Sequence, residues 1–158
     1  MNSAPLLRRA RVEEAAQLTA LALAGKRHWG YPAEWLALWR FDLTVTADYI
    51  RTQPVIVAEV EGAIVGFAGL LHAAEGDQLE HLWLRPDCIG QGLGRRLFAG
   101  IIDQARPAGM TELQIKSDPN AEGFYLKMGA VRTGEEVYEL PGGIRRVVPL
   151  LKFRIQLR

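Results

Sequence analysis

The sequence predicts an α+β or mixed-sheet domain. Two observations lead to this prediction. Apolar residues recur at helical spacing in the first third of the chain, and after Pro54 they form runs of strand length separated by short turns. The 158 residues match the size of one domain, and no linker or internal repeat marks a boundary. Residues 1–158 are therefore expected to form a single domain.

The N-terminal third is expected to be mostly helical. Gly25 is predicted to end the first helix, because glycine commonly follows a helix C-terminus. Pro32 is typical of the first position of a helix, and the Thr46 side chain is a candidate N-cap. The predicted elements are a strand over Pro5–Ala10, a helix over Val12–Ala24, a short helix from Pro32 and a short helix over Asp48–Thr52.

The rest of the chain is expected to contain most of the strands. Glu61 and Gly62 form a predicted turn between the first two of them. The predicted elements are strands over Val55–Val60, Ala63–Leu71 and Gln78–Arg85, a helix over Gly92–Ala105, a strand over Leu113–Lys116, a helix over Ala121–Met128, and strands over Val131–Leu140 and Arg146–Leu157. We summarise the whole order as β-α-α-β-β-β-α-β-α-β-β.

The composition argues against several classes of protein. Nineteen Lys and Arg residues against 18 Asp and Glu give a charge of +1, so no nucleic-acid partner is expected. Cys88 is the single cysteine, which excludes an internal disulfide and fits a reducing compartment. The longest uncharged apolar stretch, Gly62–Ala74, is shorter than the roughly 18 residues of a membrane span, and no signal peptide is evident. We expect a soluble cytoplasmic protein without a membrane partner.

The segment Gly90–Gly94 (Gly-Gln-Gly-Leu-Gly) joins a predicted strand to a predicted helix. Glycines at such a junction let the backbone approach a ligand, and free amides at a helix start point at an anion. Arg95 and Arg96 occupy the first turn, where the helix dipole disfavours positive charge by about 0.3–1 kcal/mol each. This placement favours a bound polyanion such as a pyrophosphate; the alternative is a tight turn without a ligand. The dinucleotide fingerprint is excluded, because it needs glycine where Arg95 stands.

A second block extends the pattern, because Ser117-Asp118-Pro119-Asn120-Ala121 leaves a strand and enters a helix that contains Phe124-Tyr125 and stops at Gly129-Ala130. Together with the glycine turn, this block resembles the GNAT superfamily of acyl-coenzyme-A-dependent N-acetyltransferases. The element order fits essentially the whole chain. One position departs from the pattern: the family usually has Gln or Arg where this chain has Ile89.

The resemblance implies a GNAT-like mixed, mostly antiparallel sheet, flanked by helices and splayed open between the strands Gln78–Arg85 and Leu113–Lys116. Acetyl-CoA, as cosubstrate, would lie in this wedge, its pantetheine pairing with the backbone of Leu82–Leu84 and its pyrophosphate meeting the amides of Gly90–Arg95. No metal is expected. The implied cofactor-binding residues are Leu82, Trp83, Leu84, Ile89, Gly90, Gln91, Gly92, Leu93, Gly94, Arg95, Asn120 and Tyr125.

The resemblance also implies direct attack of a primary amine on the acetyl thioester. Tyr125 occupies the family's position for the general acid that protonates the departing thiolate, and a backbone amide near Leu82 or Leu84 is the expected donor to the oxyanion. The alternative for Tyr125 is a core-packed pair with Phe124.

A general base is needed, because an amine with a pKa near 10 is only about one part in a thousand neutral at pH 7. Strand alternation predicts that Glu80 shares a face with Leu82 and Leu84, which makes it the candidate base. The alternative for Glu80 is an ion pair with an Arg at a sheet rim. His81 falls on the opposite face, and His72 lies on the neighbouring strand.

The loop from Lys26 to Tyr31 lies where this fold usually builds its acceptor pocket. The candidate acceptor-binding residues are His28, Trp29 and Tyr31, while Trp35 and Trp39 fit a core position better. A small-molecule or peptide amine is the expected acceptor. A non-catalytic acyl-CoA-binding module and a peptide-docking domain stay open as alternatives. Candidate contacts of a strand-mediated homodimer are Val147, Val148, Leu150 and Leu151.

Overall fold

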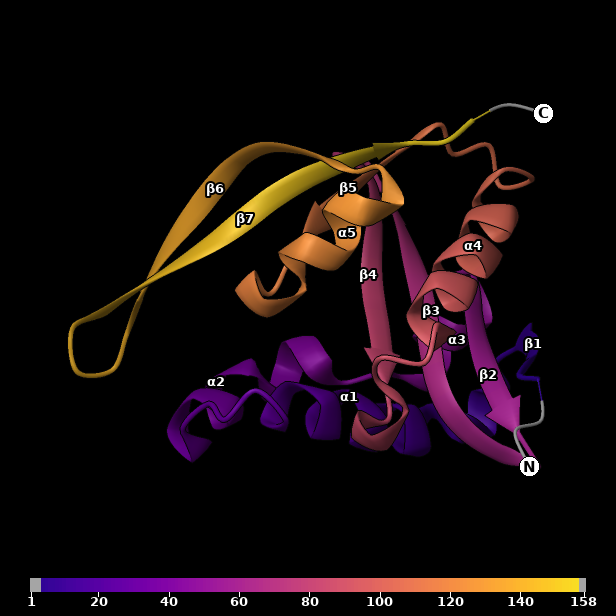
Figure 1. The fold of residues 1–158 in the computed structure, drawn as a ribbon, viewed down its shortest axis with the longest axis horizontal. Helices are drawn as coiled ribbons and strands as arrows, with labels where there is room; N and C mark the ends of the chain where they lie inside the picture. Colours follow the sequence, from indigo (N-terminus) through magenta and orange to yellow (C-terminus); the bar gives the residue numbers. More distant parts are fainter. Residues whose placement is uncertain (1–3, 157–158) are drawn as a thin grey trace.

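The computed structural model describes residues 4–156, which form one seven-stranded sheet with helices on both faces (Figure 1). The strands are β1 (Leu6–Arg9), β2 (Val55–Val60), β3 (Ala63–Ala73), β4 (Gly76–Leu84), β5 (Glu112–Lys116), β6 (Val131–Leu140) and β7 (Ile144–Arg154). The helices are α1 (Ala15–Arg27), α2 (Ala33–Leu43), α3 (Ala47–Thr52), α4 (Leu93–Ala105) and α5 (Glu122–Met128). Leu157, the predicted end of the last strand, lies outside the described residues. None of the helices in the described part of the chain has the length and apolar character needed to cross a membrane.

The mixed α+β architecture expected from the sequence is confirmed, but the predicted order is wrong in one place. Three helices precede β2, as the predicted segments do, but the summary order β-α-α-β-β-β-α-β-α-β-β counts only two of them. The Thr46 hydroxyl caps α3 by accepting a hydrogen bond from the Tyr49 amide, as expected. Gly25 does not end α1, which continues to Arg27.

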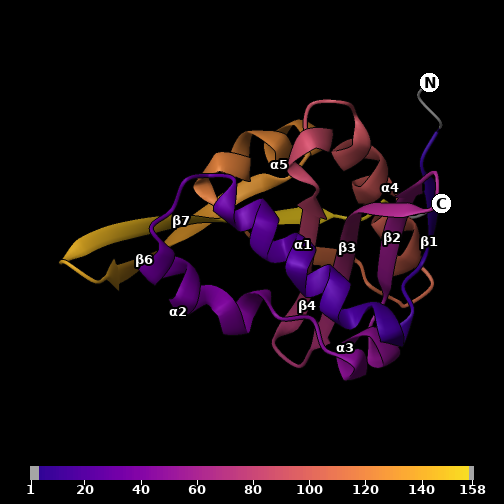
Figure 2. The same ribbon diagram turned by 90° about the horizontal axis from the view of Figure 1, so that it is seen from below.

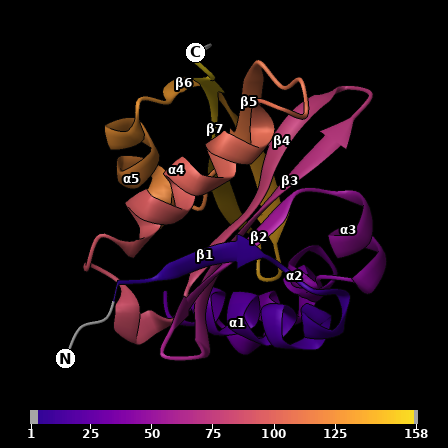
Figure 3. The same cartoon turned by 90° about the vertical axis from the view of Figure 1, so that its right-hand side faces the viewer.

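Helices lie on both faces of the sheet (Figure 3), and each face has its own hydrophobic cluster. We call the cluster that includes Leu97 and Ile101 of α4 the α4 cluster, and the cluster that includes Leu18 and Leu21 of α1 the α1 cluster. Helices α4 and α5 cover one face, and α1, α2 and α3 cover the other (Figure 2).

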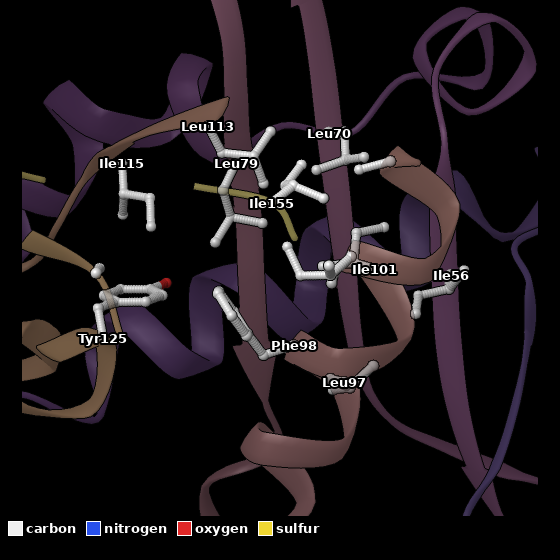
Figure 4. Close-up of a cluster of buried hydrophobic side chains, with 14 of the residues drawn as sticks. Ile56, Leu70, Leu79, Leu97, Phe98, Ile101, Leu113, Ile115, Tyr125 and Ile155 are labelled. Carbon is white, nitrogen blue, oxygen red and sulfur yellow. The ribbon is translucent and has the colours of Figure 1, made fainter. Parts of the chain in front are cut away.

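In β2, Ile56 belongs to the α4 cluster, and Val55 and Val57 belong to the α1 cluster. Because both faces of this strand are buried, it reads as a continuous apolar run rather than an alternating one. Figure 4 shows part of the α4 cluster, with Leu97 and Ile101 facing the strands.

The sheet opens between β4 and β5. The strand order is β1-β2-β3-β4-β5-β7-β6, and β4 with β5 is the one parallel pair among the described strands. These two strands have a single registered residue pair, Gln78 with Gln114. Beyond that pair the carboxyl-terminal half of β4 diverges from β5 (Figure 1). The backbone edge of β4 that faces β5 is therefore free of strand pairing over residues 80–84.

The β6–β7 hairpin projects beyond the sheet on the same side as α2 (Figures 1 and 2). Strand β7 pairs with β5 on one edge and with β6 on the other. Of the expected dimer contacts, Leu151 is 1% exposed in the core, and Leu150 and Leu151 are paired with β5. Val147 and Val148 lie beyond the residues of β7 that pair with β5, so the homodimer stays a prediction. The free edge at this end of the sheet belongs to β6.

Candidate functional site

The glycine turn between β4 and α4 presents open backbone to solvent. Gly90 and Gly92 have φ angles of 84° and 83°, and a Cβ added to either would meet no atom within 4 Å. Gly92 is the N-cap of α4, and the structure describes no acceptor for the backbone N–H groups of residues 90–95. Unpaired amides at the start of a helix without acidic residues in its first turn form a site for an anion.

A cleft of about 650 Å³ runs from this turn into the gap between β4 and β5. Twelve of the residues singled out from the sequence line it: Trp29, Glu80, Leu82, Trp83, Leu84, Ile89, Gly90, Gly92, Gly94, Arg95, Asn120 and Tyr125. The structure thus brings together residues from the loop after α1, from β4, from the glycine turn and the start of α4, and from α5 and the segment before it. Their common cleft is what a ligand lying across the splayed strands requires.

Four predicted residues are not among those that line the cleft. The side-chain amide of Gln91 donates a hydrogen bond to the backbone carbonyl of Asp87 (3.1 Å), and the Leu93 side chain is packed in the α4 cluster. The Tyr31 hydroxyl is turned toward Asp118, and the exposed His28 ring packs edge-on against Trp29. A backbone amide of residues 91 or 93 can still serve an anion, but the side chains do not.

Glu80 has no partner residue in the pairing of β4 with β3. The prediction that Glu80 shares a face of the sheet with Leu82 and Leu84 is therefore wrong. In the pairing of β3 with β4, Gly69 is opposite His81 and Leu70 is opposite Leu79, which leaves Glu80 as a bulge. The bulge places Leu79 with Leu82 and Leu84 on the α4 face. Glu80 interacts electrostatically with Tyr49 of α3 and with Asp42 of α2, so its carboxylate faces the α1–α3 side.

The Glu80 carboxylate is in an environment that favours its protonated form. Burial and the nearby Asp42 raise its pKa, and Lys116 opposes this effect. Lys116 is on β5, two residues beyond Gln114, as Glu80 is two residues beyond Gln78 on β4. The two side chains therefore flank the mouth of the splay from opposite strands, and both line the cleft.

His81 lies on the same side of the sheet as Glu80 and is a weaker candidate base. It is 5% exposed, and burial lowers its pKa to about 4. Its Nδ1 accepts a hydrogen bond from Trp83 Nε1 (3.1 Å), so its proton lies on Nε2. Trp83 in turn packs against Gly25, where a Cβ would stand 2.7 Å from the indole ring. Gly25 is thus required for close packing of α1 on β4.

Tyr125 projects from α5, and Figure 4 shows its hydroxyl pointing toward β4. The ring is packed against Phe98 and Phe124, and the residue is 7% exposed. Burial and the charge of Asp118 raise the pKa of the hydroxyl, which keeps it protonated and able to donate. No hydrogen bond of this hydroxyl to another described residue is found, and the residue lines the cleft. The ring is therefore packed in the core, as the alternative predicted from the sequence requires. The hydroxyl accepts or donates no hydrogen bond among the described residues, as a proton donor to a ligand would require.

Sequence reasoning missed a charged cluster, two members of which, Lys26 and Asp118, line the cleft. Asp118 Oδ2 lies 2.7 Å from Lys26 Nζ and 3.3 Å from Arg146 Nη2. The Tyr31 hydroxyl donates to the same carboxylate at 3.0 Å. Asn120 donates to Asp118 Oδ1 through its backbone and its side-chain amide, each at 2.9 Å. The pairing joins α1, the segment before α5 and β7, and no local sequence pattern could have revealed it.

Aromatic rings cover this cluster. Lys26 Nζ lies 5.3 Å from the Tyr31 ring centre and 4.7 Å from that of Trp39, and Arg146 lies 4.8 Å and 4.7 Å from the same two rings. Trp35 packs against both rings at 6.0 Å. Trp39 also packs against the α1 cluster, so its expected core role is confirmed, but it is at the same time one wall of a cation-binding box.

Comparison with known proteins identifies the relatives of this chain. The family model described as acetyltransferase (GNAT) domain matches residues 44–147. The chain is 33% identical over 87 residues to the L-amino acid N-acyltransferase MnaT of Escherichia coli (strain K12), a match that covers 46% of this chain and 50% of that protein. The chain spans about half the length of the curated relatives it matches.

Solved structures share the fold over nearly the whole chain. A GCN5-related N-acetyltransferase from Rhodopseudomonas palustris superposes with a TM-score of 0.78 at 24% identity and covers 98% of both chains. The structure of yncA, a putative acetyltransferase from Salmonella typhimurium with its cofactor acetyl-CoA, gives a TM-score of 0.71 at 18% identity. That match covers 99% of this chain and 96% of the other.

Proposed function

The chain belongs to the GNAT family of acetyltransferases, and on that premise we propose that it transfers an acetyl group from acetyl-CoA to a primary amine. The observation that carries the proposal is the continuous cleft that joins the glycine turn to the gap between β4 and β5. One end offers unpaired amides for an anion, and the other offers a carboxylate and a hydroxyl for proton transfer.

The residues present fit coenzyme A. The open space above Gly90 and Gly92 admits a pyrophosphate against the amides of residues 90–95, with Arg95 beside it. The unpaired edge of β4 over Leu82–Leu84 offers backbone groups to the amides of the pantetheine arm. The side-chain amide nitrogen of Asn120 donates to Tyr31 and Asp118, and its side-chain carbonyl accepts no hydrogen bond from residues 4–156. When bound, acetyl-CoA supplies the acetyl group as a thioester.

Glu80 is proposed as the general base. Its raised pKa makes the carboxylate a stronger base than an exposed glutamate, which favours removal of a proton from an ammonium group, directly or through water. The position of Glu80 at the mouth of the splay lets an amine reach it from the α1–α3 side. This environment favours catalysis over a module that only binds acyl-CoA.

Tyr125 is proposed as the general acid. Its hydroxyl is buried, protonated and free of partners among the described residues, so it can give a proton to a sulfur leaving group near β4. The oxyanion that develops on the acetyl carbonyl is proposed to receive a hydrogen bond from a backbone amide near Leu82 or Leu84, because the β5-facing edge there has no strand partner.

The proposed activity is tested by following release of the CoA thiol in the presence of acetyl-CoA and a panel of primary amines. The panel includes amino acids, polyamines and peptides with free amino termini, and the MnaT relative makes amino acids the first choice. Turnover of at least one amine above the rate of hydrolysis supports the proposal. Tight binding of acetyl-CoA without turnover of any amine would favour the binding-module alternative.

Several expectations from the sequence stay predictions. They are a cytoplasmic location, the absence of metal and nucleic-acid partners, and a homodimer. Of the residues expected at a dimer contact, Val147 is 37% exposed, and Val137, which is opposite it in the hairpin, is 44% exposed. Sedimentation showing only monomer at micromolar concentration would exclude the homodimer.

A further inference from the structure

The cluster at the acceptor end of the cleft contains more positive than negative charge. Lys26 and Arg146 share one carboxylate, that of Asp118, and the three side chains are 12%, 11% and 8% exposed. Tyr31 contributes no charge, because burial raises its pKa. Among the described residues, no second carboxylate pairs with either cation. The cluster therefore has a surplus of one positive charge in a largely buried place, which is costly unless it is compensated.

Asp118 has a single negative charge, which cannot balance two cations, and its oxygens are also fully used. They accept hydrogen bonds from Lys26, Arg146 and Tyr31, and from Asn120 twice. A carboxylate offers about four lone-pair sites, so no acceptor capacity remains. The consequence is visible at Lys26, whose pKa burial and Arg146 lower although Asp118 raises it.

The cluster is short of hydrogen-bond acceptors as well as of negative charge. The indole Nε1 of Trp35, in the same aromatic group, is buried without a partner. Lys26 uses one of its three ammonium hydrogens on Asp118, and it lines the cleft together with Trp29, Trp83 and Glu80. An anion that entered the cleft beside Lys26 would supply the missing negative charge and would accept a hydrogen bond from the Lys26 ammonium group.

We propose that the acetyl acceptor is a small amine that carries its own carboxylate, such as a free α-amino acid, and that Lys26, backed by Arg146, binds this carboxylate. Glu80, on the same side of the sheet, then meets the amine of the acceptor. This proposal rests on the proposed acetyl transfer and makes it narrower, because polyamines, internal peptide lysines and decarboxylated amines lack the required group. Lys116 is a weaker carboxylate site, because it is 59% exposed and is held by Glu136 at 3.4 Å.

The test compares amines that differ only in the anionic group. Alanine, methionine and phenylalanine are each assayed as the free amino acid, as the amide and as the decarboxylated amine, with the amine protonation of each compound taken into account. For the best side chain, we expect kcat/KM of the free acid to exceed that of the amide by tenfold or more. Equal rates, or a preference for the amide, would overturn the carboxylate site and leave acetyl transfer intact.

Substitutions at Lys26 and Arg27 separate an effect on carboxylate binding from an effect on folding. Lys26→Met keeps the aliphatic stem and leaves Arg146 and Asp118 as a one-to-one pair, so the fold is expected to persist. The preference for the free acid over its amide should fall to less than threefold, mainly through KM. Arg27→Met, at the exposed neighbouring position, is the matched control and should keep the preference. A Lys26→Met enzyme that loses activity equally on acid and amide would assign Lys26 a structural role and overturn the proposal.

A binding experiment tests the proposed carboxylate site even if the protein acetylates no amine. Calorimetry of the CoA-saturated protein with N-acetyl-phenylalanine and with its amide needs no turnover. Binding of the acid alone, lost in Lys26→Met, supports the site; equal binding of both compounds, or of neither, contradicts it. Failure of the acetyl transfer is thereby distinguished from failure of the carboxylate site.

Discussion

Glu80 has two charged neighbours that move the pKa of its carboxyl in opposite directions. Asp42 raises this pKa and Lys116 lowers it, while burial raises it further. If Glu80 acts as the base, kcat/KM falls as the pH drops through this pKa, because the carboxylate becomes protonated. We expect Asp42→Asn to move this acid limb to lower pH, and Lys116→Met to move it to higher pH. Steady-state pH profiles of the three proteins check both directions.

Replacement of the Glu80 carboxylate by an amide tests its role as a base through the reaction rate. Glu80→Gln should lower kcat/KM by about 100-fold, the lower end of what a positioned base contributes, and should remove the acid limb. An acid limb that stays in place in Glu80→Gln would assign the titrating base to another group.

Tyr125 can be altered without disturbing the packing of its ring. Tyr125→Phe keeps the contacts with Phe98 and Phe124 and removes only the hydroxyl. We expect turnover to fall tenfold or more while the affinity for acetyl-CoA, measured by calorimetry, stays within about twofold. An unchanged turnover number would show that the hydroxyl does not act in the reaction.

Ligand binding by the glycine turn can be tested by comparing a substitution at Gly92 with an equally strained substitution at Gly109, outside the cleft. Gly92→Val places a branched side chain at a φ of 83° in open space where the anion is proposed to bind. Gly109→Val imposes similar strain at a φ of 79°, also without a neighbour within 4 Å, between α4 and β5. Each should lose about 1–3 kcal/mol of unfolding free energy, but only Gly92→Val should abolish acetyl-CoA binding. Thermal unfolding and calorimetry on both variants separate the two effects.

Element boundaries followed from the sequence where local chemistry decides them. The bounds of β2 and β6 are as predicted. An apolar run and the turn residues Glu61 and Gly62 define β2, and glycines that flank β6, Gly129 and Gly142, define β6. The bulge at Glu80 was not predictable, because it depends on the register of β4 against β3 rather than on the sequence of β4. The continuation of α1 through Gly25 was missed for the same kind of reason, since tertiary contact with Trp83 requires a glycine there.

At the scale of the whole molecule, the site is assembled from distant parts of the chain. Lys26 and Asp118 are 92 residues apart, and Arg146 comes from the hairpin that closes the fold. The glycine turn lies within one short segment, so sequence reasoning could find it. The cluster of Lys26, Asp118 and Arg146 depends on how α1, the segment before α5 and β7 pack together, so only the structure could show it. Of the loop residues expected to bind the acceptor, Trp29 lines the cleft, and His28 does not.

The central claim is that the splayed sheet and the glycine turn form one site for coenzyme A. Calorimetric titration of the purified protein with acetyl-CoA, desulfo-CoA and NAD tests it most directly. The account predicts micromolar binding of both CoA compounds, since the amides and the β4 edge contact parts that they share, and no binding of NAD. Absence of heat and of thermal stabilisation with both CoA compounds would contradict the account, because the cleft would then have the shape of the site without its function.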